Sequence, residues 1–207
     1  MKQGTFITFE GSEGSGKSTQ IALIKRYLKR RGRRVLFVRE PGGVAISEKV
    51  RRILLDVANK EMGRECETLL YMAARAQLVE EVIKPALKKG VIVLCDRFLD
   101  STVAYQGYGA GVDIATIKSI GEFATQQIKP DLTLIFDIPV EKGLSRIKRK
   151  KDRIEVRALN YHNRVRNGYL ALARQEPRRV RVIKVDAGKD EIHALVKAAI
   201  EGVIRSS

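Results

Sequence analysis

Short, continuously apolar segments alternate with longer amphipathic segments along the chain. Apolar runs without polar alternation are typical of strands that are covered on both faces, as in parallel sheets. The amphipathic segments have the periodicity of helices that pack one face against a sheet. The predicted strands are 5–10, 34–40, 91–96, 132–137 and 181–186, and the predicted helices are 17–31, 44–58, 64–89, 112–128, 138–150, 155–175 and 189–204.

Glycine and proline residues fall where the predicted elements end. Gly32 and Gly90 directly follow two predicted helices, as helix-terminating residues do. Pro85 is expected to kink or restart the long third helix, because it cannot donate a helical hydrogen bond. The β–α alternation predicts a three-layer α/β fold, with a five-stranded parallel sheet and helices on both faces. A chain of 207 residues fits a single domain over residues 1–207.

The segment GSEGSGKS (11–18) matches the pattern G-x-x-x-x-G-K-[ST] in full, and it lies between a predicted strand and a predicted helix. Its glycines let backbone N–H groups turn towards phosphate, and the helix start adds partial positive charge. Lys17 can reach the outer phosphates, and Ser18 can offer its hydroxyl to Mg²⁺. The loop therefore predicts a nucleoside triphosphate site formed by Gly11, Ser12, Glu13, Gly14, Ser15, Gly16, Lys17, Ser18 and Thr19.

The net charge of +16 is compatible with a nucleic-acid binder or with an enzyme that acts on polyanionic small molecules. Two cysteines and two histidines are too few and too scattered for a metal cluster. Cys95 is expected to be buried and reduced, and His162 and His193 to be surface or packing residues. No apolar run approaches the roughly 20 residues of a membrane span. The start of the chain has no signal-peptide pattern, so a cytoplasmic location is expected.

Six segments occur in an order that resembles the signature of the thymidylate kinases, which phosphorylate dTMP to dTDP with ATP. The resemblance covers essentially the whole chain. It implies a P-loop NTPase fold, Mg²⁺ as cofactor, ATP and dTMP as substrates, a homodimer, and neither a specific nucleic-acid partner nor a membrane. The segments are FEGSEGSGKSTQ (9–20), REPGG (39–43), LLYMAAR (69–75), DRFLDSTVAYQG (96–107), DRIE (152–155) and RVRNGYLALA (164–173).

The resemblance assigns most of these segments to the acceptor nucleotide. Arg39 would hold the monophosphate, and the turn at Pro41 would bring the backbone close to the same nucleotide. Tyr71 corresponds to an aromatic residue that stacks on thymine, and Arg75 to the donor that faces O4 of the base. Of the remaining residues implied for the site, Ser101 and Thr102 would help to read the thymine edge, and Tyr105 would lie against C2′ of the sugar.

Asp96 and Arg97 end the central predicted strand, beside the phosphate loop in folds of this kind. The resemblance implies that Asp96 engages the Mg²⁺ shell together with Ser18, and that Arg97 clamps phosphate near the transfer point. It also explains the carboxylate within the phosphate loop. Glu13 would point to the acceptor side and accept a hydrogen bond from the 3′-OH.

The arginine that reaches the transferring phosphoryl group is expected to come from the basic segment SRIKRKKDR (145–153). Some thymidylate kinases carry this arginine in the loop directly after the acid, but here that position is Gly14. Arg146 would stack on adenine, and Arg149 and Arg153 are the candidates for the transferring phosphate. The three would share one face if the segment were helical. We expect residues 145–155 to form a lid that opens and closes.

Two other functions fit parts of the sequence. A deoxynucleoside kinase, or another nucleoside monophosphate kinase, would share the scaffold, with Glu40 as a possible base in the first case; Arg39 favours a charged acceptor instead. A nucleic-acid-stimulated ATPase would explain the charge, but the chain lacks an aromatic-interleaved basic stripe. The sequence departs from the family pattern at Val44 and Ser47, where threonine and glycine are usual.

Overall fold

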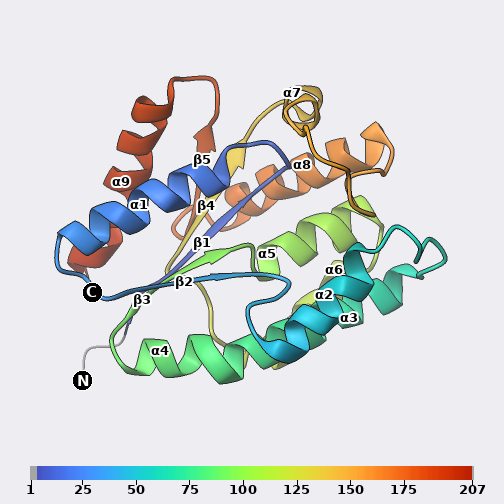
Figure 1. Ribbon diagram of the computed structural model, residues 1–207, viewed down its shortest axis with the longest axis horizontal. Helices are drawn as coiled ribbons and strands as arrows, with labels where there is room; N and C mark the ends of the chain where they lie inside the picture. Colours follow the sequence, from blue (N-terminus) through green and yellow to red (C-terminus); the bar gives the residue numbers. More distant parts are fainter. Residues whose placement is uncertain (1–3, 207) are drawn as a thin grey trace.

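The computed structural model describes residues 4–206 and contains, within that range, a parallel sheet of five strands. The order of the strands across the sheet is β2-β3-β1-β4-β5, so that the first strand of the chain lies in the centre (Figure 1). The predicted strands are confirmed, with ends that differ from expectation by at most two residues. The strands are β1 (Phe6–Gly11), β2 (Val35–Arg39), β3 (Ile92–Asp96), β4 (Leu132–Asp137) and β5 (Val180–Lys184).

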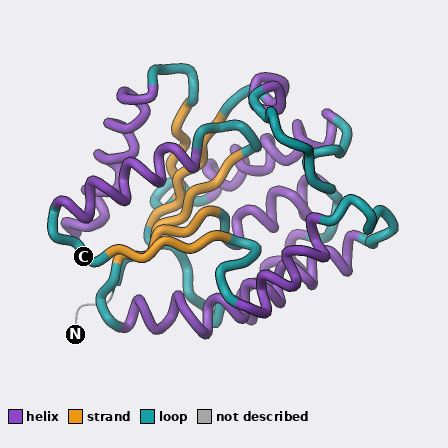
Figure 2. The backbone as a smooth tube through the Cα atoms, in the orientation of Figure 1, coloured by secondary structure: helices purple, strands orange, loops and turns teal. Residues whose placement is uncertain are grey.

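Helices cover both faces of this sheet, as Figure 2 shows. Helices α1 (Lys17–Arg30) and α9 (Lys189–Ser206) contact each other and the strands on one face. The short helices α4 (Lys84–Lys88) and α5 (Leu99–Thr102), together with α8 (Leu159–Gln175), contact the strands on the other. Helix α2 (Ala45–Leu55) packs on α3 (Arg64–Leu78), and α3 packs on α6 (Ile114–Ala124). The three-layer α/β prediction is therefore confirmed.

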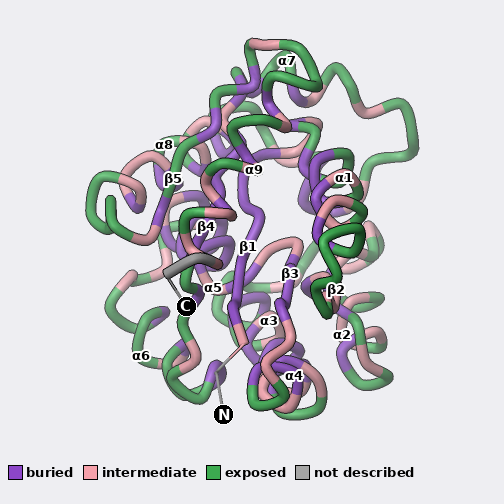
Figure 3. Tube along the Cα trace, turned by 90° about the vertical axis from the view of Figure 1, so that its left-hand side faces the viewer, coloured by how far each residue is buried: buried purple, intermediate pink, exposed green. Residues whose placement is uncertain are grey.

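The core lies on both sides of the sheet, which accounts for the continuously apolar strands. Every residue of β1 is buried (Figure 3). Ile7 and Phe9 face the cluster shared with α1 and α9, whereas Phe6 belongs to a cluster on the opposite face. Because successive side chains of a strand point to opposite faces, a strand covered on both faces needs apolar residues at every position.

The long predicted helix 64–89 is helical throughout but is not one α-helix. It changes after α3 into a π-helix, η1 (Val79–Ile83), and resumes as α4. Pro85 lies in the first turn of α4, where the N–H that proline lacks is not needed. The predicted restart is confirmed. A helical segment that the sequence analysis did not predict follows β3, in which α5 continues into the π-helix η2 (Val103–Gly109).

The expected helix 138–150 is wrong beyond its first turns. Helix α7 spans only Val140–Ser145, and within the described chain residues 146–158 contain no helix before α8 begins at Leu159. The segment is dense in cations. Arg149 pairs with Glu155, further along the chain, and Arg153 pairs with Glu67 on α3, so these arginines do not lie on one helix face. No helix among residues 4–206 is long and apolar enough to cross a membrane.

Candidate active site

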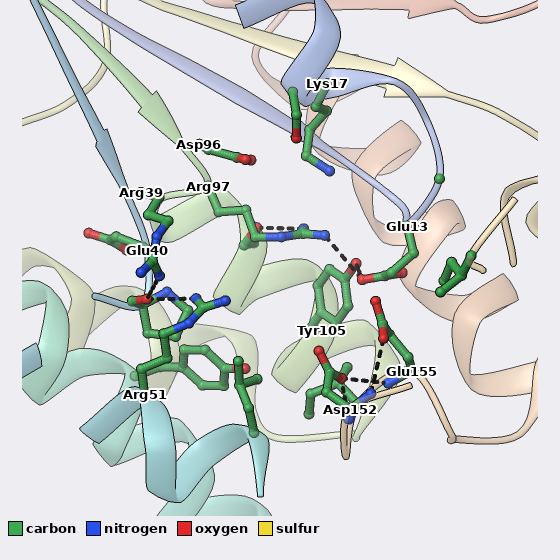
Figure 4. Close-up of a pocket in the computed structure, with 18 of the residues that line it drawn as sticks. Glu13, Lys17, Arg39, Glu40, Arg51, Asp96, Arg97, Tyr105, Asp152 and Glu155 are labelled. Carbon is green, nitrogen blue, oxygen red and sulfur yellow. Dashed lines mark hydrogen bonds and ion pairs between the residues drawn. The ribbon is translucent and has the colours of Figure 1, made fainter. Parts of the chain in front are cut away.

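A cavity of about 490 Å³ opens beyond the carboxyl ends of β1, β2 and β3 (Figure 4). The strand order explains why distant segments meet there. Arg39 is the register partner of Asp96, and Phe9, just before the phosphate loop, is the register partner of the same residue. Most of the predicted site residues line this cavity: Glu13, Gly14, Lys17, Ser18, Arg39, Pro41, Tyr71, Arg75, Asp96, Arg97, Ser101, Thr102, Tyr105, Arg146 and Arg149.

The phosphate loop itself curves from β1 into α1, and its glycines are held by their neighbours. Gly14 has a φ of 66°, and a side chain there would collide with the carbonyl of Gly143 at 2.0 Å, so the loop packs directly on α7. Gly16 caps α1 with a φ of 83°. The remaining predicted residues are not part of the described cavity wall: Gly11 ends β1, Ser12 and Ser15 lie in the loop, and Thr19 lies in the first turn of α1.

Lys17 is buried at the start of α1, with Nζ donating to the carbonyl of Gly11 at 3.1 Å. Burial, followed by the nearby charge of Arg97, lowers the pKa of Lys17 to about 8, against the weaker opposing effect of Asp96. The amine is thus held at the loop's inner surface, where it can move onto an incoming phosphate.

Glu13 and Arg97 form the centre of the cavity (Figure 4). The carboxylate accepts hydrogen bonds at Oε1 from Arg97 at 3.1 Å and from the Tyr105 hydroxyl at 2.5 Å. Burial raises the pKa of Glu13, but Arg97 and Tyr105 outweigh it, so this pKa lies below its usual range. Arg97 adopts a φ of 71°, a left-handed conformation that is rare outside glycine and is found at functional sites. The loop's acid is therefore ionised and turned away from the phosphate turn.

Arg75 lies in the cavity floor as part of a buried ion pair. Its Nε donates to Glu40 at 2.8 Å and its NH2 to Thr102 at 3.0 Å, and its side chain is 1% exposed. Burial raises the pKa of Glu40 to about 7, against the lowering effect of Arg75. The guanidinium also lies 5.3 Å from the ring centre of Phe98. The arrangement fixes the direction in which Arg75 presents its remaining donors.

Two arginines converge on the turn after β2. Arg39 and Arg51 each donate to the carbonyl of Pro41, at 3.2 and 2.8 Å, and both line the cavity. Glu48 accepts from Arg39 at 2.9 Å and from the N–H of Gly43 at 2.7 Å. Two cations with one carboxylate between them leave an excess of positive charge, which suits an anionic group.

The hydroxyl groups predicted to read the base are already engaged. Ser101 donates to Glu10 and accepts from Arg97 at 3.2 Å, and Thr102 accepts from Arg75. Glu10 is fully buried and also accepts from the N–H of Phe98, and burial followed by the charge of Asp100 raises its pKa to about 7. Both hydroxyls thus brace the charged side chains of the site.

The basic segment separates the three arginines that the sequence analysis grouped. Arg146 donates to the carbonyl of Gly14 at 3.2 Å. Arg149 is 64% exposed and forms two hydrogen bonds with Glu155, at 2.9 and 2.6 Å. Arg153 is 6% exposed, donates to the carbonyl of Leu54 and lies 2.6 Å from Glu67, and it is absent from the described cavity wall.

A magnesium ion would fit beside Asp96 and Ser18. Asp96 Oδ1 is buried without a hydrogen-bond partner in the described chain, and Ser18 is exposed to the same cavity. Within residues 4–206, no three His, Cys, Asp or Glu side chains form a cluster that could hold a metal. One carboxylate and one hydroxyl suit Mg²⁺, which keeps several waters and takes further oxygens from substrate phosphates.

Comparison with known proteins agrees with this geometry. The family model described as thymidylate kinase matches residues 9–196. The chain belongs to the thymidylate kinase family. A curated thymidylate kinase from Geotalea daltonii is 49% identical, over 96% of this chain and 97% of the relative, and one from Kosmotoga olearia is 50% identical over 92% of each. The crystal structure of thymidylate kinase from Ehrlichia chaffeensis matches with a TM-score of 0.79 and 33% identity, over 96% of this chain and 99% of that one.

Some residues of this thymidylate kinase family member were missed in the sequence. Arg51 lines the cavity, and nothing in its surroundings on the chain distinguishes it from other charged residues. Asp152 also lines the cavity; it begins the segment DRIE (152–155), but the sequence analysis gave this aspartate no role. His162 is 1% exposed and lies behind Glu13. Ser47, where the family pattern has glycine, places a hydroxyl in the interior. This buried hydroxyl is hydrogen-bonded, because it donates to the carbonyl of Ala74 at 2.7 Å.

Proposed function

We propose that this chain is a thymidylate kinase that transfers the γ-phosphoryl group of ATP to dTMP, giving ADP and dTDP. The observation that carries the proposal is one cavity lined both by the phosphate loop with Lys17 and by Arg39, Arg51 and Arg97. A cavity with cations at two places suits two phosphate-bearing substrates. An uncharged acceptor would leave Arg39 and Arg51 with one carboxylate, that of Glu48, for two positive charges.

On the donor side, the loop amides and Lys17 bind the triphosphate, and Arg146 is positioned near Gly14 to contact the adenine. On the acceptor side, Arg39 and Arg51 bind the monophosphate, and Tyr71 and Arg75 contact the base. The Glu13 carboxylate, which lines the cavity, accepts a hydrogen bond from the 3′-OH.

The attacking phosphate oxygen is anionic at neutral pH, so the reaction needs no general base. The obstacle is repulsion between two polyanions, and the chain meets it by fixing both phosphates with cations. Asp96 and Ser18 are the residues that would hold Mg²⁺, which supplies charge neutralisation between donor phosphates when bound. Lys17 and Arg97 add positive charge at the point where the phosphates meet.

We assign the remaining arginine of the transfer step to Arg149 and treat Arg153 as an anchor of the lid. Arg149 is the exposed one of the pair and lines the cavity. Arg153 is buried against Glu67 on α3. In this proposal residues 145–155 open to admit ATP and close over it, with the buried Arg153 as the fixed end.

Purified protein incubated with ATP and Mg²⁺ tests the function directly. Each of dTMP, dUMP, dCMP and thymidine is offered separately, and ADP is measured with a coupled assay. We expect dTMP to be the best acceptor and thymidine to be inert. Phosphorylation of thymidine in place of dTMP would support a deoxynucleoside kinase, and turnover that required DNA would support an ATPase; either result would refute the proposal.

The homodimer and the cytoplasmic location expected from the resemblance also belong to this proposal. Large apolar side chains are exposed on three adjoining helices: Ile46 and Ile53 on α2, Leu69 on α3 and Phe123 on α6. Burying them between two copies would remove apolar surface from water. Light scattering should give about twice the 23.2 kDa of the chain, and Leu69→Asp with Phe123→Asp should halve that mass. A monomeric wild-type protein would contradict the dimer.

A further inference from the structure

A buried histidine on α8 faces the acid of the phosphate loop. His162 is 1% exposed, and neither of its ring nitrogens has a hydrogen-bond partner among residues 4–206. Glu13 Oε2 is likewise buried without a hydrogen-bond partner in the described chain. His162 Nδ1 lies 3.7 Å from that oxygen. Buried polar groups are nearly always paired, so two unpaired atoms facing each other mark a contact that closes with a small movement.

The surroundings of His162 determine which form of the ring faces the acid. Burial lowers its pKa, and the charges of Arg157 and Lys151 from the preceding segment lower it further. Glu13 and the backbone of Arg157 act in the opposite direction. The edge of the Tyr161 ring packs at 5.3 Å between ring centres. The lowered pKa keeps the ring neutral at pH 7. In the arrangement inferred below its proton lies on Nδ1, since a bare nitrogen would place a lone pair against a carboxylate.

Glu13 needs a contact of this kind. Arg97 and Tyr105 both bind Oε1, so neither of them holds Oε2. The carboxylate can present one fixed orientation to an acceptor hydroxyl only if its second oxygen is also held. His162 Nδ1 lies nearest to the buried Oε2 and can hold it.

We propose that His162 is a positioning residue for Glu13, with its Nδ1–H directed at the buried Oε2 so that the carboxylate keeps the orientation in which it faces the 3′-hydroxyl of the acceptor. The proposal rests on the function proposed above and on the assignment of Glu13 to that hydroxyl. It adds a residue that acts through Glu13 without touching substrate. Protonation of His162 would tighten its pairing with Glu13 and draw the carboxylate away from the acceptor.

Two substitutions separate this role from simple packing. His162→Asn places an amide N–H near the position of Nδ1 and cannot become charged, whereas His162→Leu removes the donor and keeps an apolar filling. Both are compared with wild type on dTMP and on 3′-deoxy-dTMP. The quantity measured is the ratio of kcat/KM for the two acceptors, in which the ionisation of their phosphates cancels.

We expect wild type to prefer dTMP, His162→Leu to lower that preference roughly 3- to 10-fold with kcat changed less than about twofold, and His162→Asn to stay within about twofold of wild type. As the pH falls below 6.5, the ordinary pKa of histidine, the preference should fall in wild type and stay level in His162→Asn. The pH comparison uses only these two proteins, so it decides the question even if His162→Leu does not fold.

Equal losses on both acceptors in His162→Leu, or a level preference across pH in wild type, would overturn the role of His162 alone. A wild-type preference of about one at every pH would remove the Glu13 assignment and His162 with it. Failure of wild type to convert dTMP at all would overturn the proposed function first, and the inference together with it.

Discussion

Arginines in the cavity floor and arginines in the segment above it are held in opposite ways. Arg75 is 1% exposed and donates to Glu40 after β2, to Thr102 on α5 and to Met72 on its own helix. Arg149 is 64% exposed, and its side-chain partner, Glu155, is only six residues along the chain. Arg75 is held by distant parts of the fold, whereas Arg149 is held within its own segment.

The difference follows from the energetics of ion pairs. Removing one partner of a buried pair strands a charge and costs about 3–5 kcal/mol, whereas an exposed pair is worth about 0–1 kcal/mol. A fixed cation can orient a substrate because it does not move. A weakly held cation can leave its carboxylate for a phosphate at little cost. In the proposed function the first kind lies below the acceptor nucleotide, and the second kind beside the donor.

The difference between exposed and buried arginines is tested most directly by Arg149 and Arg153, which lie in the same basic segment. Arg149→Ala should lower kcat by about 10³-fold or more with little change in Tm, because its cost falls on the transferring phosphate. Arg153→Ala should instead lower the free energy of unfolding by about 1.5–3 kcal/mol, because Glu67 loses one of its cations. Steady-state kinetics and urea unfolding measure both. The reverse pattern would exchange the two roles.

In the floor, Arg75→Met should reduce the free energy of unfolding by up to about 3–5 kcal/mol above pH 7, where the ionised Glu40 is left buried without its cation. The deficit should shrink as the pH falls through about 7, since the carboxyl group of Glu40, whose pKa is raised to about 7 even beside Arg75, then takes up a proton. The double variant Glu40→Gln with Arg75→Met should recover part of the loss. A stability change below about 1 kcal/mol would mean that the pair does not hold the floor.

Arg51 lies between the two kinds, half-buried at the cavity wall. Arg51→Ala should raise KM for dTMP about 10- to 100-fold with kcat nearly unchanged, the size expected for a charged hydrogen bond to phosphate. Its neighbour Arg52 is exposed and absent from the cavity wall as described, so Arg52→Ala is the matched control. Similar KM values in both variants would remove Arg51 from the site.

Raising the pH removes the charge of Lys17, in the phosphate loop, without a mutation. The pKa of Lys17 is lowered to about 8, so the amine loses its proton as the pH rises through that value. We expect kcat/KM for ATP to fall about tenfold per pH unit above this point, because the neutral amine no longer attracts phosphate. kcat should fall much less, because bound phosphate favours the charged form. A level kcat/KM between about pH 7 and about pH 9.5 would contradict the low pKa.

Much of this architecture follows from local sequence. A strand covered on both faces must be apolar at every position, so β1 and β4 are visible as runs of letters. The phosphate loop needs glycines and a lysine at fixed spacing, because backbone and helix start must meet one ligand. Parallel strands end at the same edge of the sheet, so the residues that follow them lie close together. Most of the predicted site residues accordingly line one cavity.

Other features depend on which distant groups meet. The sequence presents Arg149 and Arg153 as equivalent members of one basic run. Only the position of Glu67 on α3 makes Arg153 a buried anchor, whereas Arg149 stays exposed. His162 looked like a packing residue because its neighbour Glu13 lies on another element. Sequence alone determined the strands, the phosphate loop and the family. The partner of each buried charge was decided by tertiary structure, because electrostatic pairing acts through space and has no periodicity along the chain.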